Sequence, residues 1–146
     1  MNHRKTESFF TMWMLDTNIC SYVLRRHPPT VKVHFDQAGP GQLAISTVVL
    51  AELLFGAAQH PSKSVEIRQD IDDMTRRLVV MPWSAQAADE YSRLRPFLQR
   101  QGTPIGGMDL LIAAHALAEN AVLVTNNLRE FRRVPNLRLE NWALVQ

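Results

Sequence analysis

The sequence predicts an α/β fold in which a mainly parallel sheet lies between two layers of helices, a three-layer α/β/α sandwich. Short apolar runs alternate along the chain with longer segments of helical periodicity, which is the pattern of parallel strands joined by helical crossovers. The length of 146 residues, 46% of them hydrophobic, suits one compact domain with its own core. We therefore expect a single domain over residues 12–146, preceded by a loose polar leader over residues 1–11.

The first crossover unit begins with an apolar run at residues 9–15, which predicts a buried strand. Asp16 ends this run and is placed to cap the helix that follows. Helices are expected at residues 19–26 and 30–35, separated by the prolines at residues 28 and 29, which would stop a helix. Asp16 is therefore expected at the C-terminal end of the first strand.

The rest of the chain continues this alternation. Apolar runs predict strands at residues 43–45, 78–81, 122–124 and 137–139, the last of them at a sheet edge. Further segments predict a helix that begins near Ser46 or Thr47 and carries Glu52, and helices at residues 62–77, 85–101 and 109–119. In parallel sheets polar sites collect beyond the carboxyl ends of the strands, where both Asp16 and Asn127 fall.

Charge and cysteine content indicate which partners and which cellular compartment to expect. Lys plus Arg total 16 against 14 for Asp plus Glu, and the net charge of +2 permits contact with a polyanion without predicting it. The lone Cys20 and the absence of zinc-site spacing favour a reducing cytoplasm without structural zinc. The apolar run at residues 9–15 is too short for a signal peptide or a membrane span, so no membrane association is expected.

Three acidic residues occur in apolar surroundings, namely Asp16, Glu52 and Asp109. Burial of one unpaired carboxylate is costly or forces its protonation, and mutual repulsion adds to the cost when several gather. A bound cation removes this cost, and hard oxygen ligands favour Mg²⁺, for which Mn²⁺ can substitute. Such an ion can generate a hydroxide near neutral pH and stabilise charge on a phosphate, so the acids indicate phosphodiester hydrolysis.

Each candidate residue also has a purely structural explanation. Asp16 could be only a helix N-cap, and Asp109 could merely complement the dipole of its helix. Glu52 could be a surface residue, although its neighbours in the sequence are apolar on nearly every side. Asn126 and Asn127 could form an ordinary turn after a strand. The metal-site hypothesis rests on the coincidence of all of these residues.

With these residues assembled, the sequence resembles the PIN-domain nucleases, and specifically the VapC-type toxins of bacterial VapBC toxin–antitoxin pairs. The matching segments, in chain order, are Met-Leu-Asp-Thr-Asn-Ile-Cys at residues 14–20, Ile-Ser-Thr-Val-Val-Leu-Ala-Glu-Leu-Leu-Phe-Gly at 45–56, Pro-Ile-Gly-Gly-Met-Asp-Leu-Leu-Ile-Ala-Ala-His-Ala at 104–116 and Val-Thr-Asn-Asn-Leu-Arg-Glu-Phe at 124–131. Each segment is modestly specific, and their combination is highly specific. The resemblance covers nearly the whole chain from Met12 onward.

The resemblance implies the PIN version of the α/β/α sandwich. It also implies that Asp16, Glu52 and Asp109 form the acidic cluster of the site. Within that cluster, Asp16 and Asp109 would be the principal metal ligands, with Glu52 positioning the ion or its water.

Three further polar residues complete the site that the resemblance implies. The fourth family position is usually Asp or Asn, and it maps to Asn127. Because Asn is neutral, the site would hold one charge fewer than four-acid relatives, which disfavours a second tightly bound ion. Thr17 and Thr125 would orient ligands or water from nearby.

Partners and a substrate follow from the same resemblance. Family members are typically homodimers, and a cognate VapB-type antitoxin inhibits them by covering the acidic pocket with its C-terminal segment. The opening Leu-Asp-Thr-Asn-Ile-Cys at residues 15–20 resembles the group that cuts initiator tRNA in the anticodon loop. The expected function is a magnesium-dependent endoribonuclease, the toxin of a type II pair, which blocks translation by cleaving tRNA.

Two other functions stay open on the sequence alone. A phosphatase of the haloacid dehalogenase type also has Asp and Thr after a strand, as at Asp16 and Thr17, but it requires a second Asp where this chain has Asn18. A non-enzymatic nucleic-acid or partner-binding module would use its carboxylates only to cap helices. Such a module would show no dependence on divalent ions.

Overall fold

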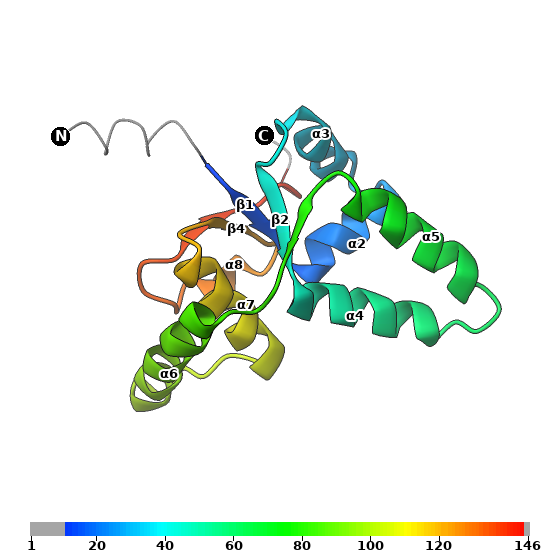
Figure 1. Ribbon diagram of the computed structural model, residues 1–146. Coiled ribbons are helices and arrows are strands. Elements are labelled where there is room, and N and C mark those ends of the chain that lie inside the picture. The colour runs from blue at the N-terminus through cyan, green and yellow to red at the C-terminus, as the bar shows by residue number, and fades with distance from the viewer. Residues whose placement is uncertain (1–10, 145–146) are drawn as a thin grey trace.

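The computed structural model describes residues 11–144, which form a five-stranded sheet with helices on both sides (Figure 1). The strands are β1 (Trp13–Leu15), β2 (Leu43–Ser46), β3 (Val79–Met81), β4 (Val122–Val124) and β5 (Arg138–Glu140). All four strand pairings are parallel. The predicted α/β sandwich is confirmed, and its sheet is parallel throughout.

The order of the strands places a crevice beside β1. The order is β3-β2-β1-β4-β5, so the chain first builds outward from β1 through β2 and β3. It then returns to add β4 and β5 on the other side of β1. In parallel α/β sheets, ligands bind where the direction of building reverses, beyond the carboxyl ends of the two central strands. Here that position lies beyond the ends of β1 and β4.

Seven helices accompany the sheet within residues 11–144. They are α2 (Thr17–Arg25), α3 (Pro29–Gln37), α4 (Thr47–Ala58), α5 (Ser64–Thr75), α6 (Ala85–Arg100), α7 (Gly107–Ala118) and α8 (Leu128–Phe131). Figure 1 shows α6 and α7 on one side of the sheet and α2, α3 and α5 on the other. In addition, α4 contacts α7, which brings the helix of Glu52 against the helix of Asp109. None of these helices is long and apolar enough to cross a bilayer.

The observed boundaries differ from the predicted ones at a few places. The first strand is shorter than expected because β1 begins at Trp13, and residues 1–10, including the start of the predicted strand and most of the predicted leader, lie outside the described residues. The two prolines do separate α2 from α3, but Pro29 is itself the first residue of α3, where its missing N–H leaves no helical hydrogen bond unmade. The short helix α8 was not predicted, because four residues are too few to show periodicity.

Side-chain caps start the helices directly at the ends of the first two strands. The Ile19 backbone N–H donates to Asp16 Oδ1 over 2.9 Å, and the Val48 N–H donates to Ser46 Oγ over 3.1 Å. Both caps satisfy donors that the first helical turn leaves without partners. The helices α2 and α4 therefore begin at the same end of the sheet, with Asp16 at the junction of β1 and α2.

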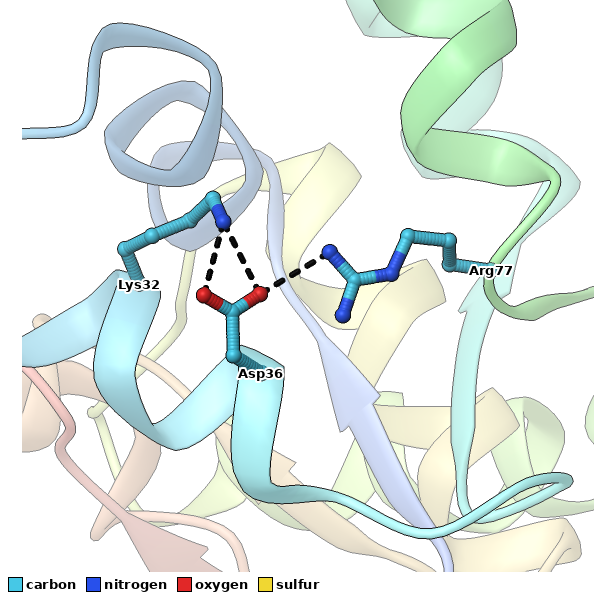
Figure 2. Close-up of polar contacts among 3 residues, drawn as sticks. All are labelled: Lys32, Asp36 and Arg77. Atoms are coloured by element: carbon cyan, nitrogen blue, oxygen red, sulfur yellow. Dashed lines mark hydrogen bonds and ion pairs between the residues drawn. The ribbon is translucent and has the colours of Figure 1, made fainter.

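An exposed ion-pair cluster fastens α3 to the segment that leads into β3. Asp36 accepts hydrogen bonds from Lys32 Nζ at 2.8 Å and from an Arg77 guanidinium nitrogen at 2.9 Å, as Figure 2 shows. Arg77 also lies over the Phe35 ring, 4.6 Å from its centroid. The hydrogen bond from Lys32, followed by that from Arg77, lowers the pKa of Asp36. The negative charge of Asp36 is thus balanced by two cationic side chains of the same chain, Lys32 and Arg77.

Candidate active site

Asp16 lies at the reversal point of the sheet and is 4% exposed. Its own N–H donates to the Val124 carbonyl over 3.1 Å, which ties the end of β1 to the end of β4. Burial raises the pKa of Asp16, whereas hydrogen bonds from the Thr125 side chain and the Ile19 N–H act in the opposite direction, and the charge of Glu52 raises it further. Asp16 is therefore a helix cap, as its structural explanation required. It is also a buried acid whose pKa is raised by the charge of a second acid.

Glu52 is partly buried on α4 and turns toward the start of α2. The Thr17 hydroxyl donates a short hydrogen bond to Glu52 Oε1, which fixes the carboxylate beside the residue that follows Asp16. A solvated surface position, the structural alternative for Glu52, does not describe this arrangement. Thr17 therefore orients one of the acids. The role toward ligands or water that the resemblance implies for Thr17 stays a prediction.

Asp109 lies in the first turn of α7 and is partly buried. Its pKa is raised to about 6, first by burial and then by the negative charges of Glu130, Asp16 and Glu52. The three predicted acids therefore do share one electrostatic environment. A role limited to the helix dipole would favour the ionised form and lower the pKa, which is opposite to the direction found here.

Thr125 and Asn127 follow β4 and organise the other side of the crevice. The Thr125 side chain is fully buried, hydrogen-bonds to the Asp16 carboxyl, and accepts from the Asn127 N–H over 2.9 Å. The Asn127 side chain donates from Nδ2 to Glu130 Oε2 over 2.8 Å. Asn127 thus contacts a further acid, Glu130, and the charge of Glu130 in turn acts on Asp109.

Glu130 is the residue of the cluster that sequence reasoning missed. It lies on the short helix α8, and its Oε1 accepts from the Gly106 N–H over 2.7 Å, just before α7 begins. A methyl group added at Gly106 would lie 3.7 Å from Glu130 Oε1 and 3.9 Å from Asp109 Oδ2, so both carboxylates face the same backbone position. The site therefore contains four acids, with the charge of Glu130 beside the neutral Asn127. The comparison with four-acid relatives stays a prediction.

A signal for Glu130 is nevertheless present in the sequence. Glu130 follows Asn127 by three residues, the spacing that places two side chains on the same face of one helical turn. The neighbouring Arg129, Arg132 and Arg133 make a surface position the ordinary interpretation of this residue. Only the folded chain shows that its carboxylate accepts from the Gly106 N–H.

None of the four acids has a cationic partner in the part of the chain that the structure describes. Within residues 11–144, no Lys, Arg or His forms an ion pair with Asp16, Glu52, Asp109 or Glu130. No three of the His, Cys, Asp and Glu side chains in that part of the chain converge into a ready-made ligand set. The two findings agree, because the carboxylates repel one another and hydroxyl and amide donors hold them in place. A bound cation would allow them to come closer together.

The chemistry of this donor set fits a hard divalent cation. All four groups offer carboxylate oxygens, and Mg²⁺ takes only one or two protein carboxylates while keeping several waters. Asp16 and Asp109 could supply such a pair. A cavity of about 510 Å³ opens beside the cluster between α2, α4 and α5, and Thr17 and Glu52 are among its lining residues.

Comparison with known proteins gives a consistent result. The PIN domain family model matches residues 13–137. Ribonuclease VapC2 of Rickettsia felis is 45% identical over 132 residues, which cover 90% of this chain and 98% of that protein. The tRNA(fMet)-specific endonuclease VapC of Shigella flexneri is 39% identical over 133 residues, again 90% of this chain and 98% of that protein.

A solved structure agrees with these sequence relatives. The crystal structure of VapBC2 from Rickettsia felis bound to a DNA fragment from their promoter matches with a TM-score of 0.83 and 41% identity. The match covers 90% of this chain and 99% of that chain. Together with the four-acid cluster at the reversal point of a parallel sheet, these matches show that the chain belongs to the PIN-domain family and, within it, to the VapC ribonucleases.

Proposed function

We propose that this protein is a magnesium-dependent endoribonuclease, the toxin of a type II toxin–antitoxin pair, and that it cleaves tRNA. The observation that carries the proposal is the gathering of four carboxylates at the crevice between β1 and β4, where no cationic side chain of residues 11–144 pairs with them. Their mutual repulsion, expressed in the raised pKa of Asp109, makes a divalent cation the natural partner of the site.

The chain's own residues divide the work among them. Asp16 and Asp109 would hold the ion, and the hydrogen bonds from Thr125 and Ile19 partly offset the rise in the Asp16 pKa that burial causes. Glu52, fixed by Thr17, would position the ion or a water that attacks the phosphate.

The remaining two residues support the opposite side of the crevice. Asn127 holds Glu130, and Glu130 in turn binds the N–H of Gly106 at the start of α7. This pair therefore sets the position of the helix that carries Asp109. Glu130 also adds negative charge that strengthens the attraction for a cation. A bound divalent ion would supply a water of lowered pKa and stabilise charge on the phosphate.

The relatives suggest the substrate and the partner. The Shigella flexneri relative is named a tRNA(fMet)-specific endonuclease, which supports initiator tRNA, cut in the anticodon loop, as the substrate of this chain. The Rickettsia felis structure is a VapBC2 complex, which supports a VapB-type antitoxin as partner. We further propose a homodimer that works in the cytoplasm, where its tRNA substrate is found.

A cleavage assay on total tRNA tests the proposal. Purified protein is incubated with tRNA in Mg²⁺, in Mn²⁺ and in EDTA, and cut sites are mapped by primer extension. Cleavage is expected with either metal and not with EDTA, and Asp109→Ala should lower the rate by about a hundredfold or more while the circular dichroism spectrum stays the same. Metal-independent cleavage, or full activity of Asp109→Ala, would refute the assignment.

The comparisons give no support to the other two functions. A dehalogenase-type phosphatase would need a second acid at position 18, and Asn18 is exposed and neutral. Release of phosphate from p-nitrophenyl phosphate should therefore be absent. A non-enzymatic module would cleave no RNA under any of the metal conditions above.

A further inference from the structure

A second cavity, with a volume of about 380 Å³, lies beside α2 and shares Arg25 with the cavity of Glu52. We call it the amide pocket, and its lining residues are Tyr22, Arg25, His27, Pro28, Asn126 and Ala143. Its volume is at the lower end of the range of about 300–1,000 Å³ that is typical of small-molecule pockets. The pocket therefore has room for one small planar group.

Two residues connect the amide pocket to the acid cluster. Asn126 stands between Thr125, which bonds to the Asp16 carboxyl, and Asn127, which bonds to Glu130. Arg25 lines both the amide pocket and the cavity that contains Glu52. A chain molecule bound with one phosphate at the acids would therefore place a neighbouring unit at the amide pocket.

Hydrogen bonds hold the polar groups of the pocket in a defined orientation. Asn126 Nδ2 donates to the Tyr22 hydroxyl over 3.2 Å, and Asn126 Oδ1 accepts from Asn141 Nδ2 over 2.9 Å. An amide has two donor hydrogens and two acceptor lone pairs, so Asn126 keeps one of each for a ligand. The Tyr22 hydroxyl keeps its own hydrogen for donation. A donor and an acceptor side by side can recognise the edge of a nucleobase.

The charges around the pocket suit the backbone of a nucleic acid. Arg25 and His27 are exposed, and neither forms an ion pair with any of residues 11–144. The Arg25 guanidinium lies 5.3 Å from the centroid of the Tyr22 ring. The unstacked bases of single-stranded RNA stack on aromatic rings and on guanidinium planes.

We infer that the amide pocket binds one base of the RNA substrate, next to the phosphate that lies at the acid cluster. The inference rests on the proposed ribonuclease function and adds to it a contact that selects the base. In this arrangement the amide of Asn126 and the hydroxyl of Tyr22 bind the edge of the base, and Arg25 contacts its face or the adjoining phosphate. The acids cut the chain, and the amide pocket determines which bond is presented to them.

The test uses the tRNA whose cut site has been mapped, assembled by ligation with single abasic nucleotides at successive positions around the cut. Four proteins are compared: the wild type, Asn126→Ala, Arg25→Ala and Arg26→Ala. Arg26 is the matched control, because it is exposed, adjacent and equally charged but lines a different cavity, with Asp70 and Asp73. Melting temperatures show whether each variant is folded.

The wild type should lose about tenfold in kcat/KM at one abasic position and little at the others. Asn126→Ala and Arg25→Ala should cut the unmodified tRNA about tenfold more slowly and lose that positional penalty, while Arg26→Ala keeps the wild-type rate and profile. A flat abasic profile in the wild type, or an unchanged penalty in both pocket variants, overturns the inference and leaves the nuclease intact. If no tRNA is cut by the wild type with Mg²⁺ or Mn²⁺, the proposed function fails and this inference fails with it.

Discussion

Two clusters of charged residues in this molecule place their acids in opposite surroundings. Asp36 receives hydrogen bonds from Lys32 and Arg77, and these bonds lower its pKa. Asp109 lies among other acids and pairs with no cationic side chain of the described residues, and its pKa is raised to about 6. Asp36 is an exposed surface group, whereas Asp109 is partly buried and its pKa responds to the charge of the buried Asp16.

The contrast separates structural acids from functional ones. An acid whose counter-charge comes from the chain contributes to stability and needs nothing further. Acids that gather without a counter-charge raise the free energy of the folded state, and a bound cation recovers that cost. The two clusters should therefore respond in opposite directions to neutralisation and to acid.

The largest effect is expected from neutralising a buried acid of the site. Asp16→Asn keeps the helix cap, because Asn caps helices as well as Asp does, but it removes one metal-binding charge. We expect metal-dependent tRNA cleavage to fall by about a hundredfold or more. The melting temperature measured in EDTA should stay the same or rise, since a buried charge is lost. The assay is the one described for Asp109→Ala.

Asp36→Asn is the control for this comparison, because it changes the same group where the chain supplies the cations. It should cut tRNA at the wild-type rate. If Asp16→Asn remained active, or if Asp36→Asn were equally inactive, the distinction between the two clusters would be lost.

Lowering the pH below about 6 should weaken metal binding at the four-acid site. Asp109 has a folded pKa of about 6 against an ordinary value of 3.8, so in the absence of metal its protonation favours the folded state, and this contribution fades as the pH rises through 6. Binding of a cation needs the carboxylate, so the apparent affinity for Mn²⁺ should fall by up to about tenfold per pH unit below pH 6.

Calorimetric titrations with Mn²⁺ between about pH 5 and about pH 7 measure this dependence. Asp36 should behave in the opposite way, because its lowered pKa supplies stability above 3.8 that is lost as the pH falls through its folded pKa. An affinity for Mn²⁺ that stayed constant over this pH range would contradict the account of Asp109.

Glu130→Gln should have an intermediate effect. Gln can still accept from the Gly106 N–H, so the loop before α7 should keep its position, while one negative charge is removed. We expect Mn²⁺ affinity to fall by about three- to tenfold and the pKa of Asp109 to move down toward its ordinary value. Carboxyl chemical shifts followed by NMR through a pH titration report that change. No movement of the Asp109 pKa would exclude Glu130 from the cluster.

The smallest effect is expected for the stability contribution of the Asp36 cluster. Asp36→Asn should lower the free energy of unfolding by less than about 1 kcal/mol, and the loss should shrink at high salt, because Asp36 and Arg77 are exposed and Lys32 is partly exposed. Urea unfolding measures it. Asp73→Asn, which removes an exposed pair with Arg76, is the matched control and should cost no more. A loss several times larger would mean that the cluster holds α3 in place through more than charge.

Much of the fold could be predicted because each strand is a short buried run with a clear polar end. Asp16 follows β1, and Thr125 follows β4, so the parallel sheet brings them together by topology alone. Glu52 and Asp109 could be recognised because a charge among valines, leucines and alanines has few structural explanations.

The parts that could not be predicted depend on contacts between distant segments. Glu130 is surrounded by arginines in the sequence, and only the approach of Gly106 to α8 shows its orientation. The contact of Asn126 with Tyr22 joins residues that are 104 positions apart. Periodicity describes the face of one helix and carries no information on such pairings.

The central claim is that four uncompensated carboxylates form a binding site for a divalent cation. Isothermal titration of metal-free protein with Mn²⁺ tests it most directly, using the wild type, Asp109→Asn and Asp36→Asn under the same conditions. The account predicts saturable binding to the wild type and to Asp36→Asn, and its loss in Asp109→Asn. Absence of binding to the wild type, or equal binding to Asp109→Asn, would contradict it.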